Sequence, residues 1–577
     1  MREEAGQAIT NSTIKTPWYR YYDGVRPHLE YPDGSLYELI EKGAKAHPDS
    51  ISYNYFGTKR TYREFIDEIN QCAEAFLAEG YGKGDYISIC MPNTPEAIIA
   101  FYAVNRIGAI ANMIHPLSSE NEISMYVKST KSRAIVVIDM ASGKIRNILH
   151  DTGLEHVIAV SVSDSMPFTM HVGYAMTKGR ENRADLTGMI SWKDWMKKGA
   201  GSNQLSFVPF AEKSDVAVIL YSGGTSGFPK GIELTNLNFN ALAIQGIEAC
   251  ESFKENDRML SIMPVFHGFG LGICIHTVQY IGGTSILLPQ FSVSTFDKLL
   301  KKYKPNFIAG VPTLFEALLL NNHFDGVDLS FLKCVISGGD SLSVSLKHKV
   351  DAFLKEHGAD IQVREGYGLT ECVTGSCLTP RNMYKEGSIG IPYPDTYYKV
   401  VKPNTEEELP YGEEGEIVLA GPTVMKGYLG NENETMEVLR VHSDGLTWLH
   451  TGDLGCMDED GFVYFKHRLK RVIMSSGYCV YPQYIENILD SHPAVFMSCV
   501  IGINHAYKKQ VPKAYIVLKD DMEADEALRQ EIRKYCEVRL ARYQWPAEYE
   551  YRSELPKTLV GKIAYSVLEK ENCTDVG

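Results

Sequence analysis

A glycine-rich segment at residues 221–231 is the part of the sequence best suited to binding phosphate. It reads Tyr-Ser-Gly-Gly-Thr-Ser-Gly-Phe-Pro-Lys-Gly and continues an apolar, strand-like run that begins at residue 215. Glycines let backbone N–H groups approach phosphate oxygens, while hydroxyls and a lysine add further donors. The residues that would bind phosphate are Ser222, Gly223, Gly224, Thr225, Ser226, Gly227 and Lys230. A Walker A loop requires Gly-Lys-Ser/Thr, which is absent, so we predict a phosphate loop of another kind.

A second apolar run, at residues 334–340, also ends in glycines, with the sequence Cys-Val-Ile-Ser-Gly-Gly-Asp. In open parallel α/β sheets, ligands bind at the carboxyl ends of the strands. We therefore expect the turn at Gly338, Gly339 and Asp340 to share one site with the first glycine-rich segment. The alternative for the first segment is a flexible linker, but linkers rarely follow a buried strand.

Four further segments follow in order along the chain. They are Gly366-Tyr-Gly-Leu-Thr-Glu371, His450-Thr-Gly-Asp453, Arg468-Leu-Lys470 with Gly477 and Pro482 after it, and Pro556-Lys-Thr-Leu-Val-Gly-Lys562. Together with residues 221–231, these segments resemble the signatures of the adenylate-forming superfamily, which includes acyl-CoA synthetases, luciferases and the adenylation domains of peptide synthetases. Residues 47–65 and 91–110 resemble its N-terminal elements, so the resemblance covers nearly the whole chain.

The resemblance implies that a carboxylate attacks the α-phosphorus of ATP in the presence of Mg²⁺, and that the acyl group then passes to coenzyme A. Both reactants are anionic, so positive charge at the phosphoryl oxygens lowers the barrier. The resemblance assigns that charge to Lys562, the Mg²⁺ ligand to Glu371 and a phosphate hydrogen bond to Thr370. The alternative for Lys562 is an ordinary surface lysine.

The nucleotide contacts are likewise implied by resemblance. Tyr367, between Gly366 and Gly368, would stack on adenine, and Gly338, Gly339 and Asp340 occupy the adenine-side turn. Asp453 would accept hydrogen bonds from both ribose hydroxyls, and Arg468 would make a second ribose contact. The structural alternatives are a core aromatic for Tyr367, a turn aspartate for Asp453 and a surface ion pair for Arg468. At position 340 the family more often has Ala or Glu.

Lys470 occupies the position of the family's hinge, about which the C-terminal domain would rotate so that a face near Gly477 meets the thiol acceptor. Arg471 departs from the acidic residue often found beside this hinge, and the sequence offers no reason for the change.

The nature of the acid is predicted from residues 264–270, Pro-Val-Phe-His-Gly-Phe-Gly, which resemble the segment lining the acyl pocket. His267 takes the aromatic gate position, with a structural histidine as the alternative. Residues 263–272 contain no Asp to pair with an α-amine, so a plain carboxylic acid is favoured. An insertion at 164–206, which we expect to be partly irregular, resembles long-chain fatty acyl-CoA synthetases. It therefore favours a medium- or long-chain fatty acid as the substrate. No long insertion follows Glu371, which favours coenzyme A as acceptor.

The elements that must position these residues read as an α/β fold. Residues 86–93 form a strand-like run, 94–108 a helix with Thr94 as N-cap, and 134–139 another strand, a pattern typical of parallel sheets. The resemblance adds two α/β subdomains and a small β-barrel-like portion in an N-terminal domain, residues 1–469. A mobile α+β domain at 470–577 follows the charged stretch KHRLKR.

Composition excludes several classes of function. The net charge of −14 argues against general nucleic-acid binding, which needs a basic surface. The twelve cysteines are spread along the chain without metal-binding spacing, so we expect free thiols. No signal peptide or membrane-spanning run is visible, which predicts a cytoplasmic protein and leaves peripheral membrane contact and a homodimer open.

Three functions are compatible with these observations. The first is a fatty acid–CoA ligase, and the second is an acyl- or aryl-AMP ligase that loads a carrier protein. Acceptance of free CoA would separate them. The third is a nucleotide-binding pseudo-enzyme, against which stand Lys230, Glu371, Asp453 and Lys562.

Overall fold

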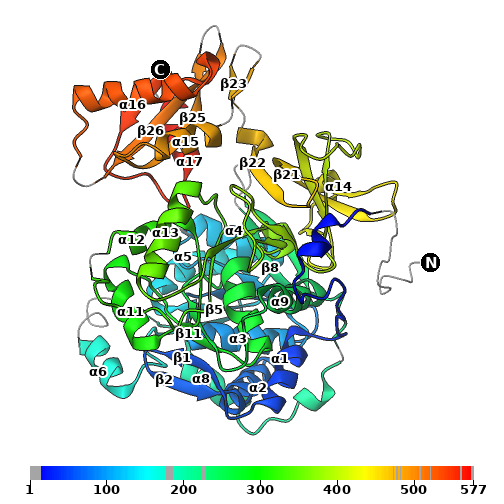
Figure 1. The fold of residues 1–577 in the computed structure, drawn as a ribbon. Coiled ribbons are helices and arrows are strands. Elements are labelled where there is room, and N and C mark those ends of the chain that lie inside the picture. Colours follow the sequence, from blue (N-terminus) through cyan, green and yellow to red (C-terminus); the bar gives the residue numbers. More distant parts are fainter. Residues whose placement is uncertain are drawn as a thin grey trace.

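The computed structural model describes residues 14–176, 186–209, 211–222, 229–321, 323–471, 473–475, 478–480, 482–505, 508–519, 522–558 and 562–573. These residues build two large α/β layers, a small curled sheet and a C-terminal α+β domain (Figure 1). The C-terminal domain lies at the top of the view, above the body formed by the two large sheets.

The first large sheet has eight strands in the order β19-β9-β8-β4-β3-β5-β6-β7. Its strands from β8 to β7 run parallel, and β9 and β19 add an antiparallel edge. The bounds are β3 Tyr86–Cys90, β4 Ile110–Met113, β5 Ala134–Ile138, β6 His156–Val160, β7 Ile190–Ser191, β8 Val216–Ser222, β9 Lys230–Thr235 and β19 Gly427–Tyr428.

The second large sheet has nine strands in the order β16-β15-β14-β13-β12-β10-β11-β1-β2. The six strands from β14 to β1 are parallel, and the outer ones are antiparallel. The bounds are β1 Ile51–Tyr55, β2 Thr58–Thr61, β10 Arg258–Ser261, β11 Thr284–Leu287, β12 Phe307–Gly310, β13 Cys334–Gly338, β14 Val363–Tyr367, β15 Cys377–Leu378 and β16 Ile391–Pro392.

Helices cover both sheets. The bounds are α1 Leu36–Ala46, α2 Tyr62–Ala78, α3 Pro95–Arg106, α4 Glu120–Thr130, α5 Ser142–Thr152, α6 Phe168–Met176, α8 Trp192–Gly199, α9 Asn236–Cys250, α10 Thr277–Tyr280, α11 Phe296–Tyr303, α12 Pro312–Leu319 and α13 Val344–Glu356. A π-helix, η4, spans Phe269–His276. Every residue of α3 from Pro95 to Asn105 is buried, as expected of a helix enclosed by the core.

The local signals of α3 act as the sequence predicts. The Thr94 side chain accepts a hydrogen bond from the Ala97 backbone N–H, and Pro95 opens the helix. Gly108 adopts φ +73° just after the last turn, a conformation that lets the chain reverse into β4. The predicted strand–helix–strand unit is therefore confirmed.

A small antiparallel sheet has the order β17-β18-β21-β20, with β22 paired to β21. Its elements are β17 Tyr397–Val401, β18 Gly415–Ala420, α14 Glu432–Val438, β20 Leu439–Val441, β21 Thr447–Met457 and β22 Val463–Arg468. Strand β22 continues to Arg468, into the charged stretch at 466–471, which shows no apolar periodicity. Its pairing with β21 explains the difference, because the partner is remote in sequence.

The C-terminal domain has a sheet in the order β24-β23-β26-β25, with β27 beside β26. Its elements are β23 Ile473–Ser475, β24 Tyr478–Val480, α15 Pro482–Asp490, β25 Val495–His505, β26 Lys509–Leu518, α16 Glu526–Arg539, β27 Glu548–Tyr551 and α17 Tyr565–Cys573. Within the insertion predicted at 164–206, the described residues include α6 and α8, and α8 buries Trp195 against α2.

Candidate active site

A cavity of about 1020 Å³ lies where the C-terminal domain meets the body of the protein. It brings together residues that the sequence predicted for catalysis and nucleotide binding: Ser222, Lys230, His267, Gly339, Asp340, Gly366, Tyr367, Gly368, Thr370, Glu371, Asp453, Arg468 and Lys562. Gly338 directly precedes Gly339 at the end of β13. Segments up to several hundred residues apart in sequence therefore form one cleft.

The cleft floor is formed where β13 and β14 end side by side. Gly338 pairs with Gly366 in the register of these parallel strands. Gly339 follows with φ +81°, a conformation that favours glycine. At Gly368 a Cβ atom would lie 2.4 Å from the Thr374 carbonyl oxygen, so the close packing of the turn requires glycine there.

Asp453 lies at the centre of a polar group on one wall of the cleft. Its Oδ2 accepts a 2.7 Å hydrogen bond from the Tyr367 hydroxyl, and its Oδ1 lies 3.1 Å from Arg468 Nε. Asp453 and Arg468 are cross-strand partners in β21 and β22, which fixes the pair. Burial raises the pKa of the Asp453 carboxyl, although Arg468 acts in the opposite direction.

A buried network supports the turn that carries Asp453. Glu416 accepts hydrogen bonds from the Gly452 backbone N–H at 3.1 Å and from His450 Nδ1 at 3.0 Å. The interaction with His450 lowers the pKa of Glu416 against the effect of burial. On its other side, His450 Nε2 lies 3.0 Å from His442 Nε2. The network holds the backbone of the turn in one conformation.

Glu371 and Lys230 meet at Tyr428 on the opposite wall. The Tyr428 hydroxyl donates a 3.0 Å hydrogen bond to Glu371, and the Lys230 ammonium lies 4.7 Å from the centre of the Tyr428 ring. Lys230 also forms an ion pair with Glu434. An anionic ligand in the cleft would compete with Glu434 for this ammonium group.

Lys562 reaches the cleft from the C-terminal domain. The Thr558 backbone N–H donates to the Lys562 carbonyl, and the Lys562 backbone N–H donates to the Thr558 hydroxyl. The Lys562 Nζ lies 3.7 Å from the position that a Cβ of Gly339 would occupy. Burial lowers the pKa of Lys562, while Asp340 favours its charged form. The ammonium group is thus held at the glycine turn of β13.

His267 opens the segment that leads into η4. Burial, reinforced by the charge of Lys562, lowers its pKa to about 3, so its imidazole is neutral at physiological pH. Next to it, the Phe266 ring packs 4.0 Å from His115. These rings form an apolar wall beside Lys562.

Some predicted residues lie elsewhere. Lys470 is in η7, Leu469–Arg471, which joins the small sheet to the C-terminal domain. Arg471 donates a 3.0 Å hydrogen bond to Glu486, and its guanidinium group stacks 3.9 Å from the centre of the Tyr565 ring. The arginine that stands where the family often has an acidic residue therefore forms an ion pair with Glu486. Two groups of predicted residues lie outside the described residues: Gly223, Gly224, Thr225, Ser226 and Gly227, and Gly477.

Sequence reasoning missed Glu416 and Tyr428. Glu416 is a charged residue inside the buried strand β18, a placement that is unusual without a polar partner, so the sequence did hold a signal for it. Tyr428 gave none, because its contacts with Glu371 and Lys230 depend on tertiary packing. Among the described residues, no group of three or more His, Cys, Asp or Glu side chains could hold a metal ion by itself.

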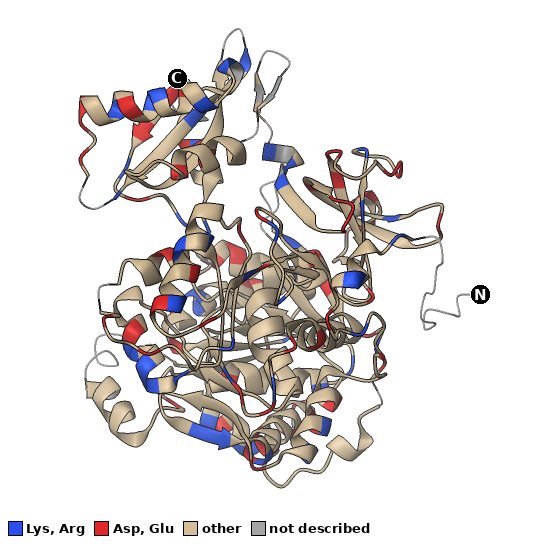
Figure 2. Cartoon of the chain, viewed as in Figure 1, with Lys and Arg blue, Asp and Glu red and all other residues tan. Residues whose placement is uncertain are grey.

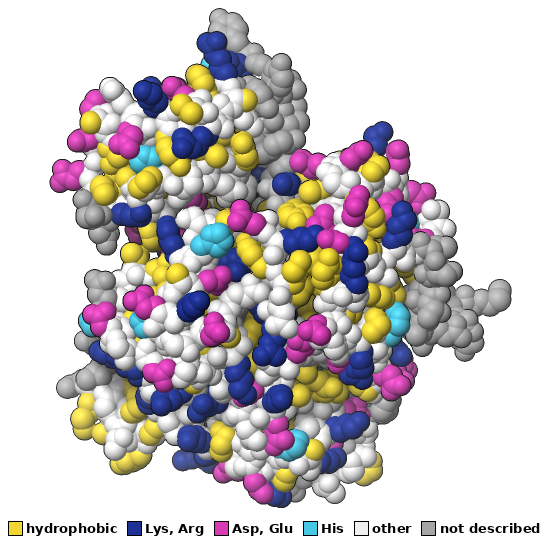
Figure 3. Space-filling view, in the orientation of Figure 1, with side chains coloured by type: hydrophobic (Ala, Val, Ile, Leu, Met, Phe, Trp, Pro, Cys, Tyr) yellow, Lys and Arg dark blue, Asp and Glu magenta, His cyan; other side chains and the backbone are white. Residues whose placement is uncertain are grey.

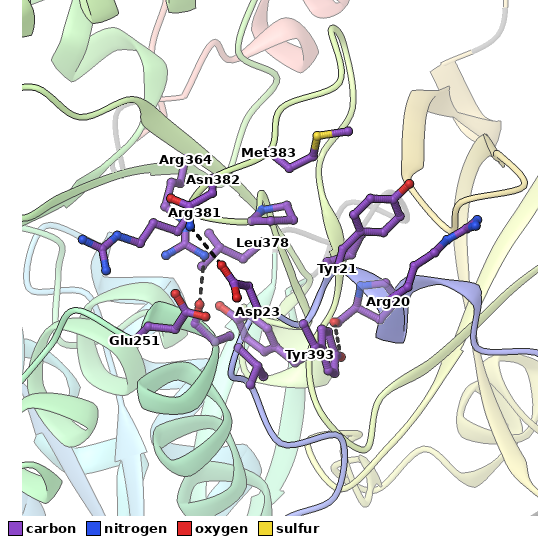
Figure 4. A pocket seen from close by; sticks show the side chains of 16 residues that line it. Arg20, Tyr21, Asp23, Glu251, Arg364, Leu378, Arg381, Asn382, Met383 and Tyr393 are labelled. Carbon is purple, nitrogen blue, oxygen red and sulfur yellow. Dashed lines mark hydrogen bonds between the residues drawn. The ribbon is translucent and has the colours of Figure 1, made fainter.

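A second, smaller cavity of about 200 Å³ lies beside the N-terminal segment (Figure 4). Its polar groups are largely satisfied within the protein. Asn382 donates to Asp23, and the buried Arg364 donates to the carbonyls of Ala249 and Cys250. The larger cleft is therefore the better candidate for catalysis. The ten cysteines whose side chains are described are free thiols, as predicted.

Comparison with known proteins defines the class. Residues 40–429 match the AMP-binding enzyme family, and residues 484–562 match the AMP-binding enzyme C-terminal domain. The chain belongs to this adenylate-forming family. No helix within the described residues is long and apolar enough to cross a bilayer.

Among curated relatives, the long-chain-fatty-acid–CoA ligase of Bacillus subtilis is 34% identical over 95% of this chain and 96% of that protein. The enzyme of that name from Haemophilus influenzae is 32% identical over 96% of this chain and 98% of its own. Among solved structures, an anthranilate CoA ligase with anthranoyl-AMP has a TM-score of 0.81 at 24% identity, covering 94% of this chain and 97% of that one. A Mycobacterium tuberculosis fatty acyl CoA synthetase has a TM-score of 0.69 at 24% identity, covering 94% and 99%. These structures establish the shared fold.

Proposed function

We propose that this enzyme is an AMP-forming acid–CoA ligase that activates a medium- or long-chain fatty acid. The observation that carries the proposal is the position of Lys562, which the C-terminal domain places in one cleft with Asp453, Tyr367 and the glycine turn of β13. The relatives at 32–34% identity that are named for long-chain fatty acids support the choice of acid.

In the first half-reaction, a carboxylate oxygen of the acid attacks the α-phosphorus of ATP, and pyrophosphate leaves with the electrons of the broken P–O bond. Lys562 stabilises the negative charge that gathers on the α-phosphoryl oxygens. Its partial burial strengthens this effect, since fewer water molecules screen the charge. The products are the acyl-adenylate and pyrophosphate.

The nucleotide would lie along the polar wall. Asp453 accepts from the ribose hydroxyls and Arg468 adds a second contact, while Tyr367 stacks on adenine above the turn at Gly338, Gly339 and Asp340. The residues that bind phosphate are Ser222, Gly223, Gly224, Thr225, Ser226, Gly227, Lys230 and Thr370. Lys230 exchanges its ion pair with Glu434 for a phosphate oxygen when ATP binds.

Glu371 fits a role as ligand of Mg²⁺. Magnesium commonly takes one or two protein carboxylates and completes its shell with phosphate oxygens and water. The Glu371 carboxylate lines the cleft, and the Tyr428 hydroxyl orients it. When bound, Mg²⁺ would neutralise charge on the leaving pyrophosphate.

The neutral His267 and the ring of Phe266 would line the entry to the acyl pocket. A neutral imidazole suits an uncharged alkyl chain, because it adds no buried charge. In the second half-reaction, rotation at Lys470 would withdraw Lys562 and bring the face near Gly477 to the cleft, where the CoA thiolate attacks the acyl carbonyl and AMP leaves.

The test is pyrophosphate release with MgATP across acids from acetate to oleate, with benzoate included, in the presence and absence of CoA. We expect turnover that requires both a fatty acid and CoA, with acyl-CoA detected by mass spectrometry. Adenylate formation without CoA turnover would point to a carrier-protein acceptor. No acid-dependent signal would refute the ligase proposal.

A further inference from the structure

Helix α6, Phe168–Met176, lies on the surface with an unusual composition. Its sequence, Phe-Thr-Met-His-Val-Gly-Tyr-Ala-Met, has no Asp, Glu, Lys or Arg. Phe168 is 82% exposed and Met176 72%, and Met170 is exposed as well. Exposed apolar side chains grouped on one element mark an interaction surface more often than scattered ones do.

The described side chains of α6 are exposed or half-buried. None of its side chains with described burial is buried in the body of the protein. Helices shorter than about 12–15 residues are marginal in water without tertiary packing. Tyr55 donates to the carbonyl of Val162, ahead of the helix, and His171 Nδ1 contacts the Ser163 carbonyl, so the start of α6 is tied to the segment before it. A partner that covers the exposed apolar side chains would add packing to this short helix.

The charges around α6 indicate what kind of partner this is. Figure 1 places α6 below α11, Phe296–Tyr303, at the lower left of the molecule. The exposed charged residues of α11 and the turn after it are all lysines: Lys298, Lys301, Lys302 and Lys304. The only acid in α11, Asp297, is buried and pairs with Lys301.

The figures show the same arrangement on the surface. In Figure 2 the ribbon of α6 carries neither blue nor red, and blue segments lie next to it. In Figure 3 a group of yellow side chains at the lower left has dark blue side chains along its edge. Asp139 and Asp164, two carboxylates near α6, are held by hydrogen bonds with Ser161, before the helix begins. A basic border on a protein of net charge −14 would orient this face toward an anionic surface.

We infer that α6 and the lysines of α11 form a docking surface for an anionic lipid bilayer. An uncharged helix with Phe, Tyr and Met side chains suits insertion at the headgroup boundary, and flanking lysines add attraction to anionic lipids. A bilayer is also where the acid would be found, because each buried CH₂ favours the membrane by about 0.8 kcal/mol. That last point rests on the proposed function, but the docking surface does not.

The experiment is cosedimentation of the full-length protein with lipid vesicles, without ATP or acid, so that its outcome is independent of ligase activity. One variant carries Phe168→Asp and Met176→Asp. The matched control carries Phe207→Asp and Val538→Asp, which alter two equally exposed apolar residues on other elements by the same charge. Vesicles contain phosphatidylcholine alone or with an equal part of phosphatidylglycerol.

We expect the wild type to bind the phosphatidylglycerol vesicles and the α6 variant to bind at least about tenfold more weakly, with less than about a threefold effect in the control. Lys298→Glu with Lys302→Glu should weaken binding to the anionic vesicles only. Added salt should weaken the wild-type binding. Circular dichroism and pyrophosphate exchange with octanoate would show that each variant is folded.

Three outcomes would overturn the inference. They are no binding by the wild type, equal loss in the α6 variant and its control, and a lipid-independent self-association that the α6 variant abolishes. The last would make α6 a contact between protein copies instead, and sedimentation velocity without lipid would detect it.

Discussion

Replacing Lys562 by alanine removes a cation that the C-terminal domain places beside the glycine turn of β13. Its Nζ lies 3.7 Å from the position that a Cβ of Gly339 would occupy, inside the cleft where we propose that ATP binds. A unit charge about 4 Å away stabilises an added negative charge by about 4 kcal/mol at an effective dielectric constant of about 20. That energy corresponds to a rate factor of about 10³.

We therefore expect Lys562→Ala to slow acid-dependent ATP–pyrophosphate exchange by about 10³-fold. Thioester formation from supplied acyl-adenylate and CoA should stay within about threefold of the wild type. In that step the thiolate attacks the acyl carbonyl carbon, and no bond to phosphorus forms or breaks. Lys570→Ala, an exposed lysine on α17, is the matched control and should leave both half-reactions unchanged.

Two results would refute this reasoning. Equal loss in both half-reactions would mean that Lys562 acts on the structure of the cleft as a whole. A loss below about tenfold in pyrophosphate exchange would mean that its charge does not reach the reacting phosphorus. Melting temperatures of both variants, measured by calorimetry, would separate a stability effect from either.

Three more outcomes are expected. Asp453→Ala should raise the KM for ATP by about 10²-fold with little change in kcat, since two charge-assisted hydrogen bonds of about 1.5 kcal/mol each are lost; a loss confined to kcat would contradict the ribose role. His267→Asn should leave the shape of the pH–rate profile unchanged between pH 5 and 8, because burial already keeps the imidazole neutral with a pKa of about 3; the disappearance of a limb in that range would show that His267 titrates there. Gly368→Ala should lower the free energy of unfolding by about 1–3 kcal/mol, because its Cβ would meet the Thr374 carbonyl at 2.4 Å; an unchanged melting temperature would show that the turn relaxes freely.

Local sequence signals made part of the fold predictable. Thr94, Pro95 and Gly108 delimit α3 because capping and positive φ are properties of a few adjacent residues. The insertion was harder, since the order of α8 comes from burying Trp195 against α2, a contact that local sequence does not encode.

The same division holds in the site. Residue types and spacing by themselves predicted a phosphate-binding loop at 221–231, and the resemblance of the segments to the adenylate-forming superfamily singled out Lys562 as the candidate catalytic lysine. Only the tertiary structure decided that Tyr367 donates to Asp453, that Glu416 holds the turn before it and that Tyr428 joins Glu371 to Lys230. These contacts join strands and loops that are tens to hundreds of residues apart, so their geometry follows from sheet register and domain packing, which no local pattern specifies.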